Sequence, residues 1–257
     1  MYSFVDTNEA PQKTNMSIQT VFNGVNLDDE LTDENGRFVT LSVSGRGIVP
    51  RRINTQESPR KHGNIERGYT LDSREINVNF LLEDISISGF RDRFNRINDI
   101  LSQPQKELKF TDEKAYFIST LSDADDPDEE TKSMKGKLIF VCNDPLKRKT
   151  KHTITVENEK NYTITGQLST PWTSETTFTD DASKYELTCA GKTLRLNYGF
   201  KKGDLLRIDY LKRRIRVNGS EVPDSVDIRS EWFKLPIGHT SISATEKTEI
   251  TYTEMFY

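Results

Sequence analysis

The side chains that most often carry out catalysis are few in this sequence and far apart. Its three histidines, His62, His152 and His239, form no HExxH-type cluster. Its two cysteines, Cys142 and Cys189, are too few for a disulfide framework and are not spaced as zinc ligands. Forty acidic residues would allow a glycosidase-like carboxylate pair, but no pair is marked out by its surroundings. We therefore expect two free thiols in a chain folded in a reducing cytoplasm, no metal or cofactor, and no enzymatic activity.

Two charged stretches could still bind something. The acidic stretch 124–136, ADDPDEETKSMKG, lacks the DxDxDG pattern and distal glutamate of a calcium loop, so we expect a solvated hairpin loop. The basic stretch 208–222, IDYLKRRIRVNGSEV, places Ile215 and Val217 on one face of a strand and Arg214 and Arg216 on the other. Its NG dipeptide predicts a tight turn. We expect a hairpin tip and a solvated strand face there, with a protein contact as the alternative.

Composition and charge argue against two further classes of protein, those that bind nucleic acid and those that insert into membranes. The chain has 257 residues and a formal net charge of −4, whereas nucleic-acid-binding domains are usually basic. No aromatic stacking platform is interleaved with the basic residues, so we expect no sequence-specific nucleic-acid binding. No window holds the eighteen or more apolar residues of a membrane span, and the N-terminus lacks the basic start and apolar core of a signal peptide. We therefore expect no membrane insertion.

The first half of the chain is dominated by short strands and one helix. The segment 74–84, REINVNFLLED, places Ile76, Val78 and Phe80 on one face at period two. Further strands are expected at 37–48, 106–112 and 115–123, and the segment 135–149 is expected to form a strand followed by a Pro-containing, basic turn. Apolar residues at helical spacing predict a helix over 89–103, with Ser88 as N-cap and Pro104 as its stop. The stripe consists of Phe90, Phe94, Ile97 and Leu101.

Between the first two strands lies the segment 49–70, which we interpret as a long loop. It contains two prolines and is basic in a chain that is acidic overall. Long loops in compact domains are often functional, and opposed charges favour docking in a fixed register. We hypothesise that this loop contacts a neighbouring subunit or an acidic partner, the alternative being a solvated loop. The candidate contacts are Arg46, Arg51, Arg52, Arg60, Lys61 and Arg67.

The second half changes character and predicts a β-sandwich. From 152 to 198 the chain is rich in Thr with interspersed Val, Tyr, Phe and Ile, and turn residues recur about every ten positions. No helical period of useful length follows residue 103. We expect a mainly β protein with an N-terminal β-rich domain of split-barrel or sandwich type over 1–145 and a sandwich over 146–257.

The order of these segments resembles the distal tail proteins (Dit) of siphophages that infect Gram-positive bacteria. The resemblance rests on TLSVSGRGIVPRR, GYTLDSREINVNFLL, FRDRFNRINDIL, KELKFTDEKAYFISTLSD, GKLIFVCNDPLKRK and GDLLRIDYLKRRIRVNG, followed by FKLPIGHTSISATEKTEITYTEMFY. It covers about residues 22–257. The family often has LPPGxN where this chain has LPIGHT, but Pro236 and Gly238 retain the turn chemistry. No inserted extra domain is expected.

The resemblance implies a structural virion protein rather than an enzyme. It implies an N-terminal β domain with one helix, and a galectin-like C-terminal sandwich that projects outward. Six copies would form a ring at the distal end of the tail tube. The ring would join the tail-tube protein to the tail-associated lysin or tip protein and often to receptor-binding proteins, while DNA passes through its lumen. The chain would be made and assembled in the host cytoplasm.

A galectin-like sandwich also raises the alternative of a carbohydrate-binding module for attachment to the host surface. Sugar sites usually present an aromatic ring for stacking together with polar groups for the hydroxyls. The candidates for such a sugar or partner contact are Trp172, Arg213 and Arg214. Because a fold does not carry a function with it, this alternative needs evidence from the site itself.

Overall fold

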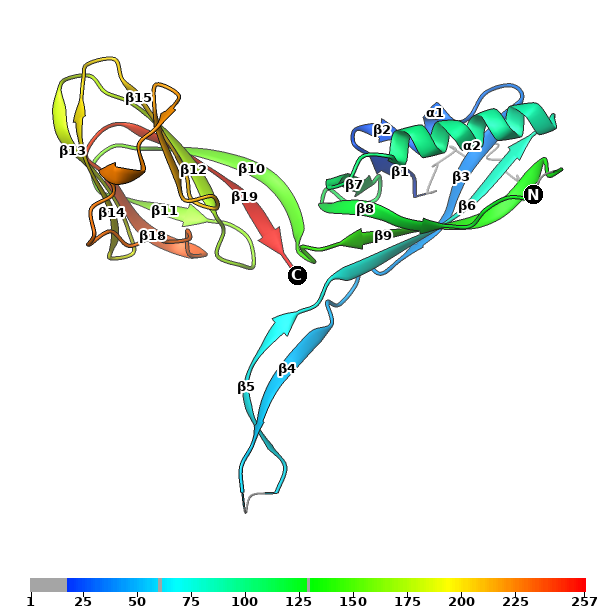
Figure 1. The fold of residues 1–257 in the computed structure, drawn as a ribbon, viewed down its shortest axis with the longest axis horizontal. Helices are drawn as coiled ribbons and strands as arrows, with labels where there is room; N and C mark the ends of the chain where they lie inside the picture. Colours follow the sequence, from blue (N-terminus) through cyan, green and yellow to red (C-terminus); the bar gives the residue numbers. More distant parts are fainter. Residues whose placement is uncertain (1–17, 60–61, 129) are drawn as a thin grey trace, which may run out of the picture. The chain divides into compact units, whose positions relative to one another are not determined.

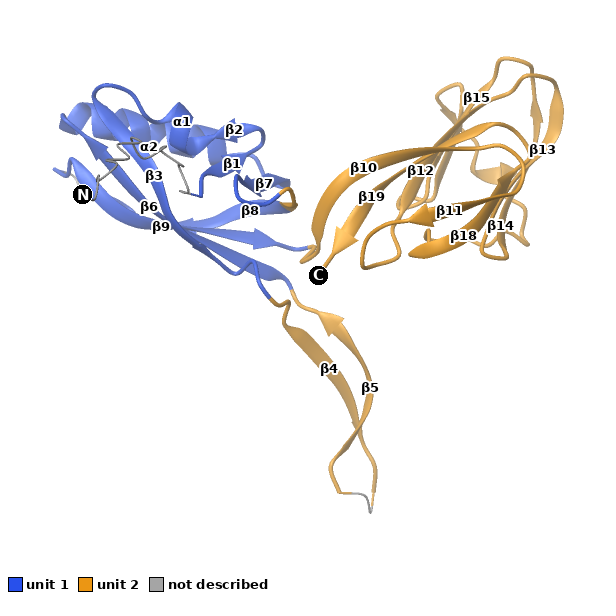
Figure 2. Cartoon of the chain, turned by 180° about the vertical axis from the view of Figure 1, so that it is seen from behind, with its two compact units in different colours: residues 1–47, 73–113, 118–143 blue, residues 48–72, 114–117, 144–257 orange. Residues whose placement is uncertain are grey.

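The computed structural model describes residues 18–257 except 60, 61 and 129. The described residues divide into two compact units, which are coloured separately in Figure 2. Unit 1 is formed by residues up to 47 together with 73–113 and 118–143, and unit 2 by residues 48–72, 114–117 and 144–257. Both units consist mainly of strands, as Figure 1 shows, so the predicted fold class is confirmed.

Unit 1 is an antiparallel sheet covered by a helix. Strand β6 pairs with both β3 and β9, and β9 pairs with β8. From β8 the sheet continues through β7 and β1 to β2. Figure 1 shows α2 lying along one face of this sheet. The elements are β1 Thr20–Phe22, β2 Val25–Asn26, α1 Leu27–Glu30, β3 Gly36–Ser44, β6 Arg74–Asp84, α2 Ile87–Leu101, β7 Lys106–Phe110, β8 Tyr116–Ala124 and β9 Ser133–Cys142.

The core of unit 1 is aromatic. The rings of Phe38 and Phe80 stack with centroids 5.2 Å apart, and those of Phe22 and Phe140 lie 5.7 Å apart. Beneath this core the buried carboxylate of Asp28 accepts hydrogen bonds from the backbone N–H groups of Thr20 at 3.0 Å and Thr40 at 2.7 Å. Since a buried carboxylate needs such donors, Asp28 ties β1 to the outer edge of β3.

The helix prediction was correct in kind and wrong in detail. Helix α2 begins after Ser86, whose side chain accepts from the N–H of Gly89 at 2.9 Å, so Ser86 and not Ser88 is the N-cap. Phe90, Ile97 and Leu101 are buried as the stripe predicted. A second helix, α1, was not predicted, because a single turn is too short to show a helical period.

Unit 2 contains a sandwich of two antiparallel sheets. One has the order β17-β16-β15-β12-β19-β10 and the other β11-β18-β13-β14. The elements are β10 Lys147–Val156, β11 Lys160–Ile164, β12 Trp172–Thr177, β13 Ala182–Cys189, β14 Lys192–Phe200, β15 Leu205–Asp209, β16 Arg214–Val217, β17 Ser220–Glu221, the 3₁₀ helix η1 Pro223–Ser225, β18 Gly238–Ala244 and β19 Thr248–Phe256. The buried residues of the two sheets form one apolar cluster, with Tyr185, Leu194 and Ile250 fully buried.

Unit 2 also includes a hairpin that belongs to neither of those sheets. Among the described residues, strands β4 Arg51–Glu57 and β5 Asn64–Leu71 pair only with each other and form a two-stranded sheet of their own. Figure 1 shows them as a long twisted ribbon. The segment 49–70 is therefore a β-hairpin for most of its length, and the prediction of a long loop was wrong.

Candidate assembly surfaces

The hairpin β4–β5 exposes nearly all of its surface. Every residue of β4 is exposed and no described residue of β5 is buried. Ile53 faces Tyr69 across the ladder, and these two apolar side chains are 56% and 43% exposed. The Arg51 guanidinium lies over the Tyr69 ring, 4.5 Å from its centroid. One face of the ribbon thus presents an aliphatic side chain, an aromatic ring and a cation together.

The other basic residues predicted to make assembly contacts have different side-chain partners. Arg52 pairs with Asp72 at 2.6 Å, and Arg67 Nε donates to the Gln56 amide oxygen at 2.9 Å. Arg46 does not belong to the hairpin. Its guanidinium donates to both carboxylate oxygens of Asp112, at 2.8 and 2.9 Å. Arg46 therefore forms a bidentate clamp inside unit 1, while Arg51, Arg52 and Arg67 line the hairpin.

Arg60 and Lys61, the two remaining candidates, lie outside the described residues. At the other end of the hairpin, the hydroxyl groups of Tyr69 and Tyr257 lie 3.5 Å apart. The contact with Tyr69, together with partial burial, raises the pKa of Tyr257 above its usual value. The base of the hairpin therefore touches the residue that follows β19, and the contact leaves Ile53 uncovered.

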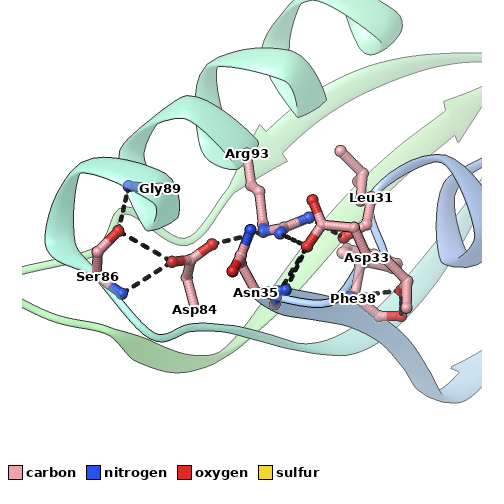
Figure 3. Close-up of polar contacts among 10 residues, drawn as sticks. Leu31, Asp33, Asn35, Phe38, Asp84, Ser86, Gly89 and Arg93 are labelled. Atoms are coloured by element: carbon pink, nitrogen blue, oxygen red, sulfur yellow. Dashed lines mark hydrogen bonds and ion pairs between the residues drawn. The ribbon is translucent and has the colours of Figure 1, made fainter.

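A polar network fixes the junction between β6 and α2, and Figure 3 shows it. The carboxylate of Asp84 accepts from the backbone N–H of Ser86 at 2.8 Å and from Arg93 Nε at 2.8 Å. Arg93 also donates to the Leu31 carbonyl at 2.7 Å and pairs with Asp33. One guanidinium thus ties the helix to the end of β6 and to the loop after α1.

The ion pairs of this network shift the pKa of each member. Burial acts to raise the pKa of Asp84, but hydrogen bonds from the Ser86 N–H and from Arg93 outweigh it, so the pKa is lowered. Hydrogen bonds from the Asn35 N–H and from Arg93 lower the pKa of Asp33. Burial opposes the charge of Arg93, and the two carboxylates more than compensate, so its pKa is raised. All three groups are therefore held in their charged forms.

Sequence reasoning did not identify Arg93 or this network. The Arg93 side chain is only 11% exposed, and that of Asp84 only 2%. The one usable signal was Asp84 two residues before a serine N-cap, an arrangement in which a carboxylate can accept from the backbone of the turn. The partners of Arg93 on the loop after α1 are about sixty residues away in sequence, so no local pattern connects them.

The basic stretch near the C-terminus forms the hairpin β15–β16, as predicted. Ile215 and Val217 are buried, and Arg214 is exposed on the opposite face. Arg214 and Arg216 both pair with Glu221, at 2.9 and 3.3 Å. Arg214 and Arg216 therefore already have an acidic partner, Glu221, within this chain.

Arg213 and Trp172, the other residues considered for a sugar or partner contact, differ in accessibility. Arg213 lies at the hairpin tip with a positive φ of 48°. Trp172 is a core residue that is 2% exposed, and its indole N–H donates to the Phe233 carbonyl at 2.8 Å. A ring buried and bonded in this way offers no face for stacking on a sugar, so the aromatic platform expected of Trp172 is missing.

The described part of the chain holds no group of three or more His, Cys, Asp or Glu that could bind a metal ion. Among the described residues, Cys142 and Cys189 form no disulfide, as predicted, and both are buried. No helix in this part of the chain is long and apolar enough to cross a membrane. The features that stand out are therefore surfaces rather than a reactive centre: the ribbon β4–β5 and the junction between β6 and α2.

Two family models match the chain on either side of its middle. The phage tail protein RIFT-related domain matches residues 25–142, and the C-terminal domain of the siphovirus-type tail component matches residues 165–256. The distal tail protein of Bacillus phage SPP1 is 27% identical over 249 residues, which are 93% of this chain and 97% of that protein. The chain belongs to the distal tail protein family of siphophages. It is a structural protein of the tail tip and not an enzyme.

Solved structures agree with this distal tail fold. The crystal structure of the SPP1 Dit protein, described as a paradigm of the hub adsorption apparatus in phages infecting Gram-positive bacteria, superposes with a TM-score of 0.82. It is 24% identical and covers 93% of this chain and 99% of its own. A chain of the activated phage P2 baseplate with calcium has a TM-score of 0.53 at 11% identity, covering 93% of this chain and 98% of its own. Both solved structures therefore share the fold of this chain.

Proposed function

We propose that this distal tail protein forms a closed ring of six copies at the end of the tail tube. The ring joins the tail-tube protein on one side to the tail-associated lysin or tip protein on the other, and can anchor receptor-binding proteins. DNA crosses its lumen without base-specific contacts. Residues 1–145 build the ring, and the galectin-like sandwich of residues 146–257 projects from it. The positions of the two family matches, 25–142 and 165–256, support this division.

The observation that best supports self-assembly is the ribbon β4–β5. An isolated two-stranded hairpin is marginally stable in water and normally needs further strands or a packed face. In the part of the chain that the structure describes, this ribbon is joined to no other sheet, and it leaves Ile53 and Tyr69 exposed. A contact with a neighbouring subunit would supply the missing face. Opposed potentials at that contact would fix its register, and Arg51, Arg52 and Arg67 would provide the positive side.

Light scattering on the purified protein, followed by negative-stain imaging of the same peak, tests the ring. We expect the mass of about six protomers and ring-shaped particles. A protein that stays monomeric at every concentration would overturn self-assembly by this chain. The variant R51S/R52S/R67S should lose mass toward the monomer, because it removes the cations of the ribbon. A matched control, R207S/K212S/R214S on the hairpin β15–β16, should keep the mass of the native particle.

A further inference from the structure

The sandwich sheet β17-β16-β15-β12-β19-β10 carries a row of polar side chains on its outer face. Residues directly opposite each other in an antiparallel ladder lie on the same face of the sheet. The ladders of β10, β19, β12, β15 and β16 place one residue of each strand in register: Thr153, Thr251, Thr173, Asp209 and Arg214. None of these residues is buried, so the row lies on the solvent side of the sheet.

Two hollows lie along this row. The first, of about 300 Å³, is lined by Thr251, Thr173 and Asp209. The second, of about 250 Å³, is lined by Thr173, Asp209 and Arg214. Because Thr173 and Asp209 line both hollows, the two adjoin, and we call them together the sandwich trough. Leu211, which is 70% exposed, adds an apolar side chain to the lining of the first hollow.

The lining of the sandwich trough is basic, although the chain carries a formal net charge of −4. Its basic residues are Arg148, Lys151, Arg207, Lys212, Arg214 and Arg216, and its acidic residues are Glu175 and Asp209. Some of the basic residues have an acidic partner of their own: Arg148 pairs with Asp144, Arg207 with Glu175 and Lys212 with Asp209. Arg214 and Arg216 share the one carboxylate of Glu221, and Lys151 forms no ion pair among the described residues. The trough therefore has positive charge left over, which suits an anionic ligand.

The threonines of the trough supply hydroxyl groups in fixed positions. A β-branched side chain on a strand has few χ1 rotamers, so little conformational entropy is lost when its hydroxyl binds a ligand. The hydroxyls of Thr153 and Thr251 lie 3.0 Å apart, and that of Thr173 has no hydrogen-bond partner among the described residues. A hydroxyl both donates and accepts hydrogen bonds, and the hydroxyl groups of a sugar require both.

Two other classes of anionic ligand fit the sandwich trough less well. Single-stranded nucleic acid needs exposed aromatic rings on which its bases stack, whereas Trp172 and Tyr252 in the lining are only 2% and 4% exposed. A protein segment normally docks through an apolar centre, whereas the centre of the trough is formed by Thr173 and Asp209. An acidic oligosaccharide combines hydroxyl groups with negative charge and matches both properties of the lining.

We propose that the sandwich trough binds an acidic oligosaccharide. Lys151 and Arg214 contact its anionic groups, and the hydroxyls of Thr173 and Thr251 form hydrogen bonds with its hydroxyl groups. Leu211 packs against the apolar C–H face of a sugar ring. All of these residues belong to unit 2, so the proposed site is complete within one copy and does not depend on the proposed ring.

Titration calorimetry on the purified native chain tests the site with three probes of equal length. Hexagalacturonate carries hydroxyls and carboxylates, maltohexaose carries hydroxyls alone, and hexaglutamate carries carboxylates without hydroxyls. Hexagalacturonate should bind about tenfold more tightly than either of the others, since each of them lacks one set of hydrogen bonds or charge contacts. Equal binding of hexaglutamate would overturn the proposal and identify a cationic surface for an acidic protein segment. No binding of hexagalacturonate would overturn it as well.

A pair of valine variants tests the role of the hydroxyls at constant charge and nearly constant size. T173V/T251V removes two hydroxyls from the trough and should weaken the binding of hexagalacturonate by about tenfold. The matched control is T155V/T177V, because Thr155 and Thr177 are exposed on the same sheet and line neither hollow. The control should bind as the native chain does. An undiminished affinity of T173V/T251V, or an equal loss in the control, would overturn the proposal.

The variant R207S/K212S/R214S separates this inference from the proposed ring. It removes three cations of the trough and should lose the binding of hexagalacturonate, while it keeps the mass of the native particle. Particles of the ring mass that bind no hexagalacturonate in their native form would overturn the sugar site alone. A native chain that stays monomeric and still binds hexagalacturonate would overturn the ring alone and support the sugar site.

Discussion

The two basic hairpins of this chain, β4–β5 and β15–β16, look alike in sequence and differ in the structure. Each has an isoleucine near the centre of one strand, with arginines close to it in the sequence. Ile215 of β16 is 3% exposed, because β15 is part of a sheet whose inner face is the sandwich core. Ile53 of β4 is 56% exposed, because its ribbon has no sheet to join. One hairpin is completed within the chain, and the other leaves its isoleucine exposed among the described residues.

The largest expected difference between them is in the free energy of unfolding after truncation of these isoleucines. I215A should destabilise the sandwich by about 2–5 kcal/mol, because it removes buried atoms and leaves a cavity. I53A should change the stability of the monomer by less than about 0.5 kcal/mol, as exposed substitutions usually do. Urea unfolding followed by tryptophan fluorescence measures both, since Trp172 and Trp232 lie in the sandwich. Equal losses would contradict the distinction.

The same contrast explains which features could be predicted from the sequence. Segment 74–84 was confirmed residue for residue, because its alternate side chains are buried and period two is visible. The ribbon β4–β5 was interpreted as a loop because neither face is buried, so hydrophobicity does not alternate along it. A strand that buries neither face shows little of the alternating pattern by which strands are predicted from a sequence.

Two features of unit 1 leave no signal in the sequence. Leu41 is 48% exposed although it lies within the expected strand 37–48, in which Phe38 is buried. The register of β3 with β6 shifts between Thr40 and Ser42, so Leu41 is the additional residue of a bulge. The Arg93 network was missed because it joins residues far apart in sequence. Neither a bulge nor a long-range ion pair leaves a periodic signal.

A smaller effect is expected at two turn glycines, Gly219 between β16 and β17 and Gly63 just before β5. Gly219 has φ of 86° and Gly63 has φ of 74°, and a side chain at either position meets open space but a strained backbone. G219A should destabilise the sandwich by about 1–2 kcal/mol, the usual penalty for a side chain in the left-handed region. G63A has a similar local penalty, but the ribbon packs on no core. Tryptophan-detected unfolding should therefore respond to G219A and not to G63A; a matching loss from G63A would show that the ribbon is coupled to the sandwich core.

The smallest expected effect is on the pH dependence of the completed hairpin. The Asp204 carboxylate accepts from the Lys201 N–H at 2.8 Å and from the Asn218 side-chain amide at 2.8 Å. Asn218 lies in the β16–β17 turn and also accepts from the Leu205 N–H, so Asp204 braces both strands. The hydrogen bond from the Lys201 N–H, followed by that from Asn218, lowers the pKa of Asp204.

A pKa lowered by folding stabilises the native state above the unfolded value, which is about 3.9 for an aspartate. That stabilisation is lost as the pH falls through the lower, folded value. Tryptophan-detected urea unfolding should therefore show a smaller drop in stability between pH 6 and pH 3 for D204N than for the native chain. Asp181 and Asp227 also have lowered pKa values in the sandwich, so the native chain loses stability from several sites, and only the difference between the two proteins reports on Asp204. Equal drops in the two proteins would mean that Asp204 does not brace the β15–β16 hairpin.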